Sequence, residues 1–338
     1  MKILIVKLDH IGDFALLVPS LSAVIAAVGA ENVGVVTNSV NRQWRDLLPQ
    51  VSFWQTIDFP AYSRRKSGLP ARLRLVSDLA LLTLRLRIAR FTIAVDLRTQ
   101  VGYYEGKLVC WLSGARRRVG GLAGRSARLF LTHVHDLDSG HESERLRQRL
   151  AFALGQDLPF SVENHLRLPP PVRRVPGRIV IHPGAGYPAK QWPVAHWRAL
   201  IASLAQEFPA GEILVTGGGN DTALATMIAA GTAANLRLTA TIPAMAELIA
   251  SAALLIGLDS AAGHLAALCG TRSITIFSGT TDPTRWRALG QARIVTHSVP
   301  CAPCWLGECK VPGHPCMTEI FPSLVFSEVM KSVRSGVV

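Results

Sequence analysis

Strand-like and helix-like hydrophobic patterns alternate along almost all of this 338-residue chain, and this alternation restricts the folds available to it. Short apolar runs of strand length are followed by longer segments with helical periodicity. Repeated βα order predicts parallel sheets with helices on both faces. We therefore expect an α/β protein.

The pattern divides the chain into two similar halves. Expected strands cover residues 2–8, 33–37, 53–59 and 91–97 in the first half, and 178–181, 212–216, 236–238, 254–256 and 273–277 in the second. Expected helices cover residues 13–28, 41–48, 69–89, 142–154, 194–207, 221–230 and 244–252. The pattern stops at residues 155–177, where Pro169, Pro170, Pro171 and Pro176 disfavour helix and remove ladder donors. We expect an N-terminal lobe at 1–160, a linker at 161–177 and a C-terminal lobe at 178–338.

Composition limits the function classes. A hydrophobic content of 49% with 17% charged residues indicates a compact globular protein. The net charge of +13 indicates an anionic partner: nucleic acid, a membrane surface or a phosphorylated substrate. The first apolar run is broken by Lys7, Asp9 and Asp13, and no uninterrupted apolar stretch reaches ~18 residues. We expect a cytoplasmic protein that contacts a membrane face through its basic residues.

Residues 253–270, A-L-L-I-G-L-D-S-A-A-G-H-L-A-A-L-C-G, have the pattern of a strand, a loop and a helix. The free N–H groups and the dipole at such a helix start favour an anion, which makes phosphate the natural ligand. Hydroxyl and imidazole groups can donate to phosphate, and a carboxylate can bind a sugar hydroxyl. A plain helix cap and a surface histidine are the alternative. The candidate donor-binding residues are Asp259, Ser260, Ala261, Gly263 and His264.

Two further loops follow expected strands. In H-P-G-A-G-Y-P-A-K-Q-W-P (182–193), Gly184 and Gly186 expose backbone N–H groups and Lys190 adds an ammonium, which suits a phosphate without Walker spacing. In H-I-G-D (10–13), Gly12 permits close approach of a ligand at the carboxyl edge of the sheet. Asp13 is either a general base or an ordinary helix-start residue.

Basic residues dominate the first half. Between residues 64 and 90 the only acidic residue is Asp78, and a second basic cluster follows at 116–118. These arginines either solvate a helix face or receive an anionic partner. The candidate acceptor-binding residues are Lys7, Gly12, Arg64, Arg65 and Arg117.

Four cysteines cluster at residues 301–316 with the spacing C-x2-C-x4-C-x6-C. In a cytoplasmic protein, clustered thiols indicate metal ligation before disulfides. A structural zinc or iron ion held by Cys301, Cys304, Cys309 and Cys316 is one interpretation, and a reduced cluster that stabilises the loop is the other.

Three motifs together resemble the ADP-heptose:lipopolysaccharide heptosyltransferases, glycosyltransferase family 9. They are K-I-L-I-V-K-L-D-H-I-G-D-F-A-L-L-V-P-S-L, H-P-G-A-G-Y-P-A-K-Q-W-P, and L-D-S-A-A-G-H-L-A-A-L-C-G followed by F-S-G-T-T-D-P. The resemblance implies a GT-B architecture, with two Rossmann-like lobes and parallel sheets facing a central cleft. It also implies inverting transfer of heptose or a related sugar from an ADP-sugar to an anionic lipopolysaccharide core acceptor, with no catalytic metal or other cofactor.

The resemblance also assigns roles to residues. Asp13 matches the base that deprotonates the acceptor, Lys190 matches the lysine that neutralises the diphosphate, and Asp259, Ser260 and His264 match the donor-binding segment. Family members commonly carry glycine where Ala261 stands, so a need for positive φ there would shift this loop. The implied enzyme works on the cytoplasmic face of the inner membrane as a peripheral protein and binds no nucleic acid. A sugar-nucleotide epimerase and a basic nucleic-acid-binding protein are the alternatives.

Overall fold

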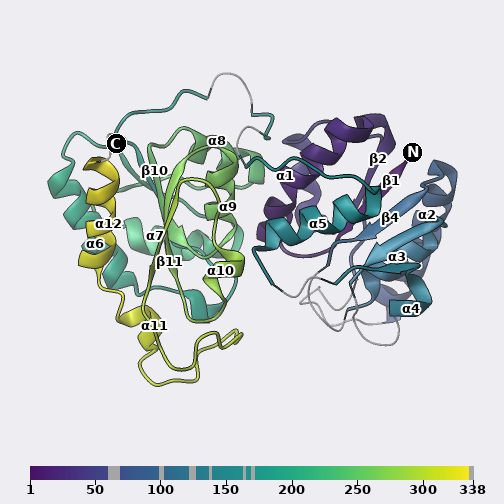
Figure 1. Cartoon of the computed structure of the whole chain (residues 1–338). Helices are drawn as coiled ribbons and strands as arrows, with labels where there is room; N and C mark the ends of the chain where they lie inside the picture. Colours follow the sequence, from purple (N-terminus) through teal and green to yellow (C-terminus); the bar gives the residue numbers. More distant parts are fainter. Residues whose placement is uncertain are drawn as a thin grey trace. The chain divides into compact units, whose positions relative to one another are not determined.

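The computed structural model describes residues 1–59, 69–98, 103–121, 127–136, 139–162, 165–168 and 172–334. The chain divides into two compact units, Met1–Ser161 and Val162–Val338. Each unit contains its own parallel sheet with helices packed on it (Figure 1). The predicted α/β class with two Rossmann-like lobes is confirmed. The predicted central cleft stays a prediction.

In the described part of the first unit, six parallel strands lie in the order β3-β2-β1-β4-β5-β6. They are β1 (Ile3–Lys7), β2 (Val33–Thr37), β3 (Phe53–Thr56), β4 (Ile93–Asp96), β5 (Arg117–Gly120) and β6 (His133–Val134). The helices are α1 (Ile11–Val28), α2 (Leu69–Ala89), α3 (Glu105–Leu112), α4 (Ala127–Phe130) and α5 (Glu142–Leu154). Every residue of β1, β2 and β4 is buried, as expected for strands covered on both faces.

Helix α1 is long and apolar enough to cross a membrane by length and composition. In this structure its residues Phe14–Leu21 are all buried, and its only carboxylate is Asp13 in the first turn. Phe14 stacks on Trp44 with ring centroids 5.6 Å apart. Core packing therefore accounts for the apolar composition of α1.

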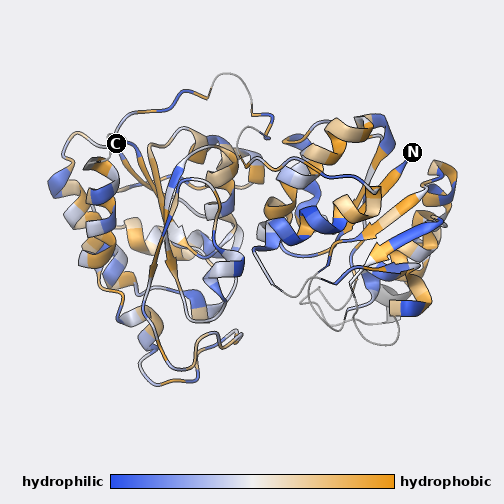
Figure 2. Cartoon of the chain, viewed as in Figure 1, coloured by the Kyte–Doolittle hydropathy of each residue, from blue (hydrophilic) through white to orange (hydrophobic). Residues whose placement is uncertain are grey.

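The second unit repeats the plan, with the described strands in the order β12-β11-β10-β7-β8-β9, all parallel. The strands are β7 (Ile179–His182), β8 (Ile213–Val215), β9 (Asn235–Leu236), β10 (Leu254–Leu258), β11 (Arg272–Phe277) and β12 (Ala292–Thr296). The helices are α6 (Val194–Glu207), α7 (Thr222–Ala229), α8 (Ile242–Ala250), α9 (Ala261–Leu268), α10 (Pro283–Trp286), α11 (Pro315–Thr318) and α12 (Pro322–Arg334). The central strands of both sheets are largely hydrophobic (Figure 2).

Several elements differ from the sequence prediction. In place of the helix expected at 41–48, the structure has a 3-10 helix at Ser39–Asp46. Asn38 caps its start, and the Asn38 side chain accepts a hydrogen bond from the Asn41 N–H. The sequence patterns missed α3, α4, α10, α11, α12, β5, β6 and β12, most of which are short or carry charged residues. Arg117, expected in a basic cluster, lies in the edge region of the sheet as the first residue of β5.

Candidate active site

The first group of functional candidates lies where β1 and β4 end. Strand β1 pairs with β2 on one side and β4 on the other, so the strand order reverses direction at β1. Ligands of open α/β sheets bind at the carboxyl ends of strands at such a switch point. Asp13 lies there, in the first turn of α1, and its Oδ2 accepts a hydrogen bond from the His10 N–H at 3.1 Å. The helix-start interpretation of Asp13 therefore describes a real contact.

Beneath Asp13 is a buried ion network that the sequence analysis did not anticipate. Lys7 is fully buried, and its Nζ lies 2.8 Å from Asp9 Oδ2. Arg98 Nε lies 3.1 Å from Asp9 Oδ1, and Arg98 Nη1 lies 3.2 Å from Glu105 Oε2. Nearby, Lys107 Nζ lies 3.2 Å from Asp96 Oδ2. Removing one partner of such a buried ion pair leaves an unpaired buried charge, which strongly destabilises the folded protein.

The electrostatic surroundings raise the proton affinity of Asp13. Burial, followed by the nearby Asp9 carboxylate, raises the pKa of Asp13 from 3.8 to about 6, although Lys7 opposes the shift. Such a carboxylate is mostly ionised at neutral pH but accepts a proton more readily than an ordinary aspartate. Asp13 therefore has the raised pKa that suits a general base, in addition to its helix-start contact.

Two of the predicted acceptor-binding residues, Lys7 and Arg117, contact other parts of the protein. Lys7 is a buried partner of Asp9 and is not available at the surface. Arg117 donates from Nη2 to the Phe152 carbonyl oxygen at 2.9 Å and lies over the Phe152 ring. Gly12 is the second residue of α1 and is half-buried beside Asp13. Arg64 and Arg65 lie outside the described residues.

The second group of candidates lies at the corresponding switch point of the second sheet. Strands β7 and β10 are neighbours, with His182 paired in register with Gly257. The loop after β7 and the loop after β10 therefore start side by side. These loops contain Lys190 and Asp259, which are 69 positions apart in the sequence.

Lys190 and Asp259 form a direct ion pair. Lys190 Nζ lies 2.5 Å from Asp259 Oδ2, and Thr281 Oγ1 donates to the same oxygen at 2.9 Å. Asp259 is buried, whereas Lys190 is half-buried at the end of a 3-10 turn, Pro188–Lys190. The carboxylate thus fixes an ammonium beside the start of α9.

The start of α9 is suited to an anion. Ser260 is the N-cap residue, but its side chain makes no capping hydrogen bond. Its Oγ is buried and has no hydrogen-bond partner among the described residues. The N–H groups of the first turn are therefore not used by a side-chain cap, and the helix dipole adds positive potential there. His264 is buried one turn further along the helix.

Alanine at position 261 introduces no backbone strain. Ala261 is the first helical residue of α9. Among the described residues other than glycine, positive φ occurs only at Arg90, Trp305 and His314. The loop therefore does not require glycine at this position, and the shift considered for Ala261 does not arise.

The predicted phosphate-binding glycines have different surroundings. A Cβ at Gly184 would collide with the Asp221 carboxylate, so protein packing requires this glycine. A Cβ at Gly186 would meet nothing within 4 Å, and one at Gly263 would meet Thr275 Oγ1 at an ordinary 3.4 Å. Open space for a ligand is therefore found at Gly186 and not at Gly184. Burial also lowers the pKa of His182 to about 4, which keeps this neighbouring ring neutral.

The four clustered cysteines are not arranged as a metal site in the described residues, and a structural metal ion there stays a prediction. All four thiols are free, and in the described part of the chain no group of three or more His, Cys, Asp or Glu side chains could hold a metal ion. Cys316 is buried in the core of the second unit, whereas Cys301 is exposed. Burial, with a smaller contribution from the nearby thiols of Cys309, Cys301 and Cys304, raises the pKa of Cys316.

Two Rossmann-like units, one with the half-buried Asp13 carboxylate after its first strand and the other with a lysine beside an uncapped helix start, define a GT-B glycosyltransferase. The chain belongs to glycosyltransferase family 9 (heptosyltransferase), whose family model matches residues 85–314. This confirms the family inferred from the three motifs, and the protein is a glycosyltransferase.

Individual relatives agree with this assignment. The chain is 26% identical to lipopolysaccharide heptosyltransferase 1 of Pseudomonas aeruginosa, over 91% of this chain and 87% of that protein. Its fold is similar to that of E. coli heptosyltransferase WaaC with ADP, with a TM-score of 0.77, 19% identity and coverage of 98% and 99% of the two chains. E. coli ADP-heptose lps heptosyltransferase II has a TM-score of 0.75 at 19% identity, with 99% of each chain covered.

Sequence reasoning missed three residues that the site depends on. Asp9 and Arg98 were missed because their importance comes from burial and mutual pairing, which no local pattern reveals. Thr281 stands in the motif F-S-G-T-T-D-P, but its hydrogen bond to Asp259 joins two segments that are 22 positions apart, which no local pattern predicts. The one available signal was position: Asp9 directly follows the expected strand at 2–8, and Thr281 lies four residues after the expected strand at 273–277.

Proposed function

We propose that this protein transfers heptose, or a closely related sugar, from its ADP-activated form to an anionic core glycolipid of lipopolysaccharide. The proposal is supported by membership of family 9 and by relatives that are named as lipopolysaccharide and ADP-heptose heptosyltransferases. The second unit would hold the donor, and the first unit would receive the acceptor.

Asp13 is proposed as the base. The acceptor hydroxyl gives its proton to the Asp13 carboxylate, and the oxygen attacks the anomeric carbon of the donor sugar. The bond from that carbon to the β-phosphate oxygen breaks, ADP leaves, and the configuration inverts. A pKa of about 6 suits a base that must be ionised at neutral pH yet accept a proton.

Lys190 and the start of α9 are proposed to stabilise the leaving diphosphate. The Lys190 ammonium is held by Asp259, and the uncapped N–H groups of α9 provide further donors beside it. Fixed positive groups at the place where negative charge develops lower the barrier without reorganisation. These groups provide the charge stabilisation that a metal provides in other transferases, so we propose that catalysis needs no metal ion.

The observation that carries the proposal is the Lys190–Asp259 ion pair at the uncapped start of α9. Ser260, with its unpartnered buried hydroxyl, and His264 lie in the same loop and first helical turns. Gly186 leaves open space in the neighbouring loop. Together these features supply a lysine, a hydroxyl, an imidazole and backbone donors for a sugar diphosphate.

The anionic acceptor also suggests where the protein works. A net charge of +13 favours approach to phosphorylated glycolipid and to anionic membrane lipid. We propose that the protein acts at the cytoplasmic face of the inner membrane as a peripheral protein.

The test is transfer from ADP-heptose to heptose-deficient core glycolipid, followed by ADP release and product mass. Lys190→Ala should lower kcat/KM by about a hundredfold or more, because it removes a charge that stabilises the leaving group. Lys331→Ala, which removes an exposed lysine from α12, serves as the matched control and should retain full activity. Binding of ADP-heptose without glycolipid product would refute the acceptor, and absence of ADP-sugar binding would refute the donor.

A further inference from the structure

Helix α2 is apolar on both its faces. Leu82 and Leu86 are buried in the core of the first unit, and Leu75, Leu79 and Ala89 pack against that core. On the opposite side, Leu73, Val76, Leu84 and Ile88 are 58% to 70% exposed. They recur at helical spacing along one face of the helix. A surface helix normally carries polar residues on that side, and none of the described residues covers this apolar face.

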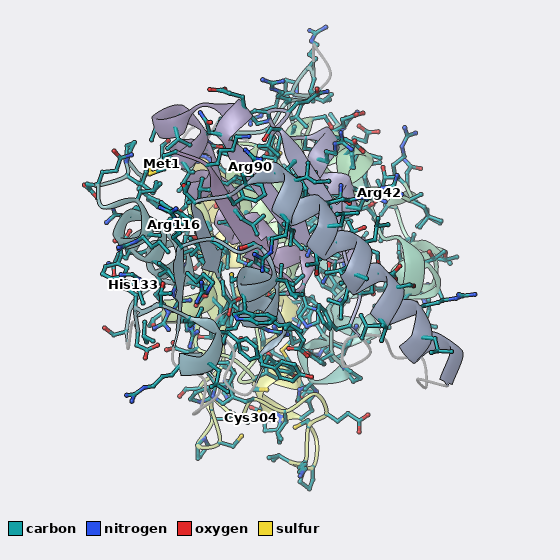
Figure 3. The ribbon with its side chains drawn as sticks, turned by 90° about the vertical axis from the view of Figure 1, so that its right-hand side faces the viewer. Met1, Arg42, Arg90, Arg116, His133 and Cys304 are labelled. Carbon is teal, nitrogen blue, oxygen red and sulfur yellow. The ribbon has the colours of Figure 1, made fainter. Side chains whose placement is uncertain are left out.

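Basic side chains border these exposed apolar residues. Arg74, Arg85 and Arg87 are exposed on α2, and Arg90 follows directly after the helix. Within the described residues, these four arginines form no ion pair, and Asp78 is the one acidic residue in the described part of α2. We define the α2 face as Leu73, Val76, Leu84 and Ile88 together with Arg74, Arg85 and Arg87. Figure 3 looks onto the side of the first unit along which α2 runs, with Arg90 labelled near the end of the helix.

An aromatic residue lies beside this face. The Arg87 Nε donates to the Leu112 carbonyl oxygen at 2.9 Å, which ties α2 to the end of α3. The preceding residue, Trp111, is 46% exposed and packs edge-on against Phe130. Exposed tryptophan beside leucines and arginines is the composition of helices that lie in the interface of a bilayer.

We propose that the α2 face binds the surface of a membrane that contains anionic phospholipid. Its leucine, isoleucine and valine side chains insert among the acyl chains, and its arginines contact the phosphate groups of the lipids. This inference rests on the proposed function only in that a glycolipid acceptor brings the enzyme to a bilayer.

A second copy of the chain fits the face less well. In a two-fold symmetric pair the same patch meets itself, so the arginines of one copy would approach those of the other. Like charges brought together this way oppose association, and the net charge of +13 adds to the repulsion. An anionic surface neutralises the same arginines and covers the same leucines.

The test is co-sedimentation of the full-length protein with vesicles of phosphatidylethanolamine and phosphatidylglycerol, compared with phosphatidylcholine alone. Leu84→Gln/Ile88→Gln removes two inserting side chains that face away from the core, so the variant should fold normally. Its binding to the phosphatidylglycerol vesicles should fall about tenfold or more. The matched control, Met227→Gln/Leu324→Gln, changes two exposed apolar residues of the second unit and should bind as the unaltered protein does.

Several outcomes would overturn the inference. Absence of binding by the unaltered protein, or unchanged binding by the α2 variant, would do so. Loss of a dimer in the α2 variant, with vesicle binding intact, would assign the face to a second copy instead. Transfer to a deacylated, water-soluble core acceptor is measured on the same samples. Transfer without vesicle binding refutes only the α2 face, whereas vesicle binding without any transfer refutes the proposed function and leaves the face intact.

Discussion

Asp13 shows how one side chain combines a structural contact with a chemical role. Its Oδ2 accepts the His10 N–H, which is an ordinary contact at a helix start. Burial and the Asp9 carboxylate raise its pKa to about 6, which an ordinary helix-start residue does not require. Because the same carboxylate is compatible with a helix start and with the proposed base, the sequence alone could not separate the two interpretations.

The raised pKa of Asp13 predicts a pH dependence of activity. As the pH falls below about 6, the base becomes protonated and kcat/KM should fall towards tenfold per pH unit. Asp13→Asn should reduce transfer by at least about a hundredfold at pH 8, because the amide cannot accept the proton. Rates measured from pH 5 to pH 9 check both statements. A profile without an inflection near pH 6 would argue against Asp13 as the base.

The same residue also predicts a gain in stability on mutation. The pKa of Asp13 in the folded protein lies above 3.8, the ordinary value for an aspartate. Ionisation of this carboxylate therefore lowers the free energy of unfolding. This cost is absent below pH 3.8, grows as the pH rises through 6, and reaches at most about 3 kcal/mol. Asp13→Asn should therefore raise the free energy of unfolding at pH 8 but not at pH 4, as measured by urea denaturation. Asp46→Asn, at an exposed aspartate, is the matched control and should change stability little at either pH.

At the scale of elements, the segment Cys301–Cys316 supports the loops of the proposed donor site. Its Gly307 carbonyl oxygen accepts from the Ala189 N–H at 3.0 Å, and the Cys304 and Trp305 N–H groups donate to the Gly279 and Thr280 carbonyl oxygens. His314 Nε2 lies 3.0 Å from the Ala189 carbonyl oxygen. Both partners of Asp259, Lys190 and Thr281, therefore directly follow residues held by this segment.

This support predicts an effect of His314 on donor affinity. His314→Ala removes the hydrogen bond to Ala189 and should weaken ADP binding about fivefold, the equivalent of about 1 kcal/mol. Calorimetric titration with ADP measures the change, and circular dichroism checks that the variant is folded. Lys310→Ala, an exposed change in the same segment, should bind ADP normally. Equal affinity of the two variants would show that the segment does not position Lys190.

At the scale of the whole molecule, each unit has a parallel sheet of its own. The core of the second unit joins β7, β8, β10 and β11 to α6 and α12, so its C-terminal helix packs within the same unit. The proposed donor groups all lie in this unit. A unit with a complete core and a complete donor site should fold and bind nucleotide by itself.

We therefore expect a fragment of residues 162–338 to bind ADP with an affinity close to that of the full chain, and to transfer no sugar. Calorimetry and the glycolipid assay measure the two properties. The same fragment with Lys190→Ala is the control, and its ADP binding should be weaker. A folded fragment without ADP affinity would mean that the donor site needs residues of the first unit.

The sequence by itself determined the class of fold, because strands buried on both faces and helices between them leave periodic hydrophobic patterns. The runs at Ile3–Lys7 and Leu254–Leu258 are examples, and the three motifs that follow such runs were enough to identify the family. Local chemistry also singled out Asp13, Lys190 and Asp259. These signals are local in the sequence, so they can be recognised without the tertiary structure.

Only the tertiary structure decided which candidates meet and which are buried. It paired Lys190 with Asp259 and enclosed Lys7 against Asp9, and in the described residues it did not arrange the four thiols as a metal site. It also left the outer face of α2 exposed among the described residues. Contacts between distant segments depend on strand order and packing, and the order β12-β11-β10-β7-β8-β9 brings the loops after β7 and β10 together. Hydrophobic periodicity specifies that a strand exists, but not which strand becomes its neighbour.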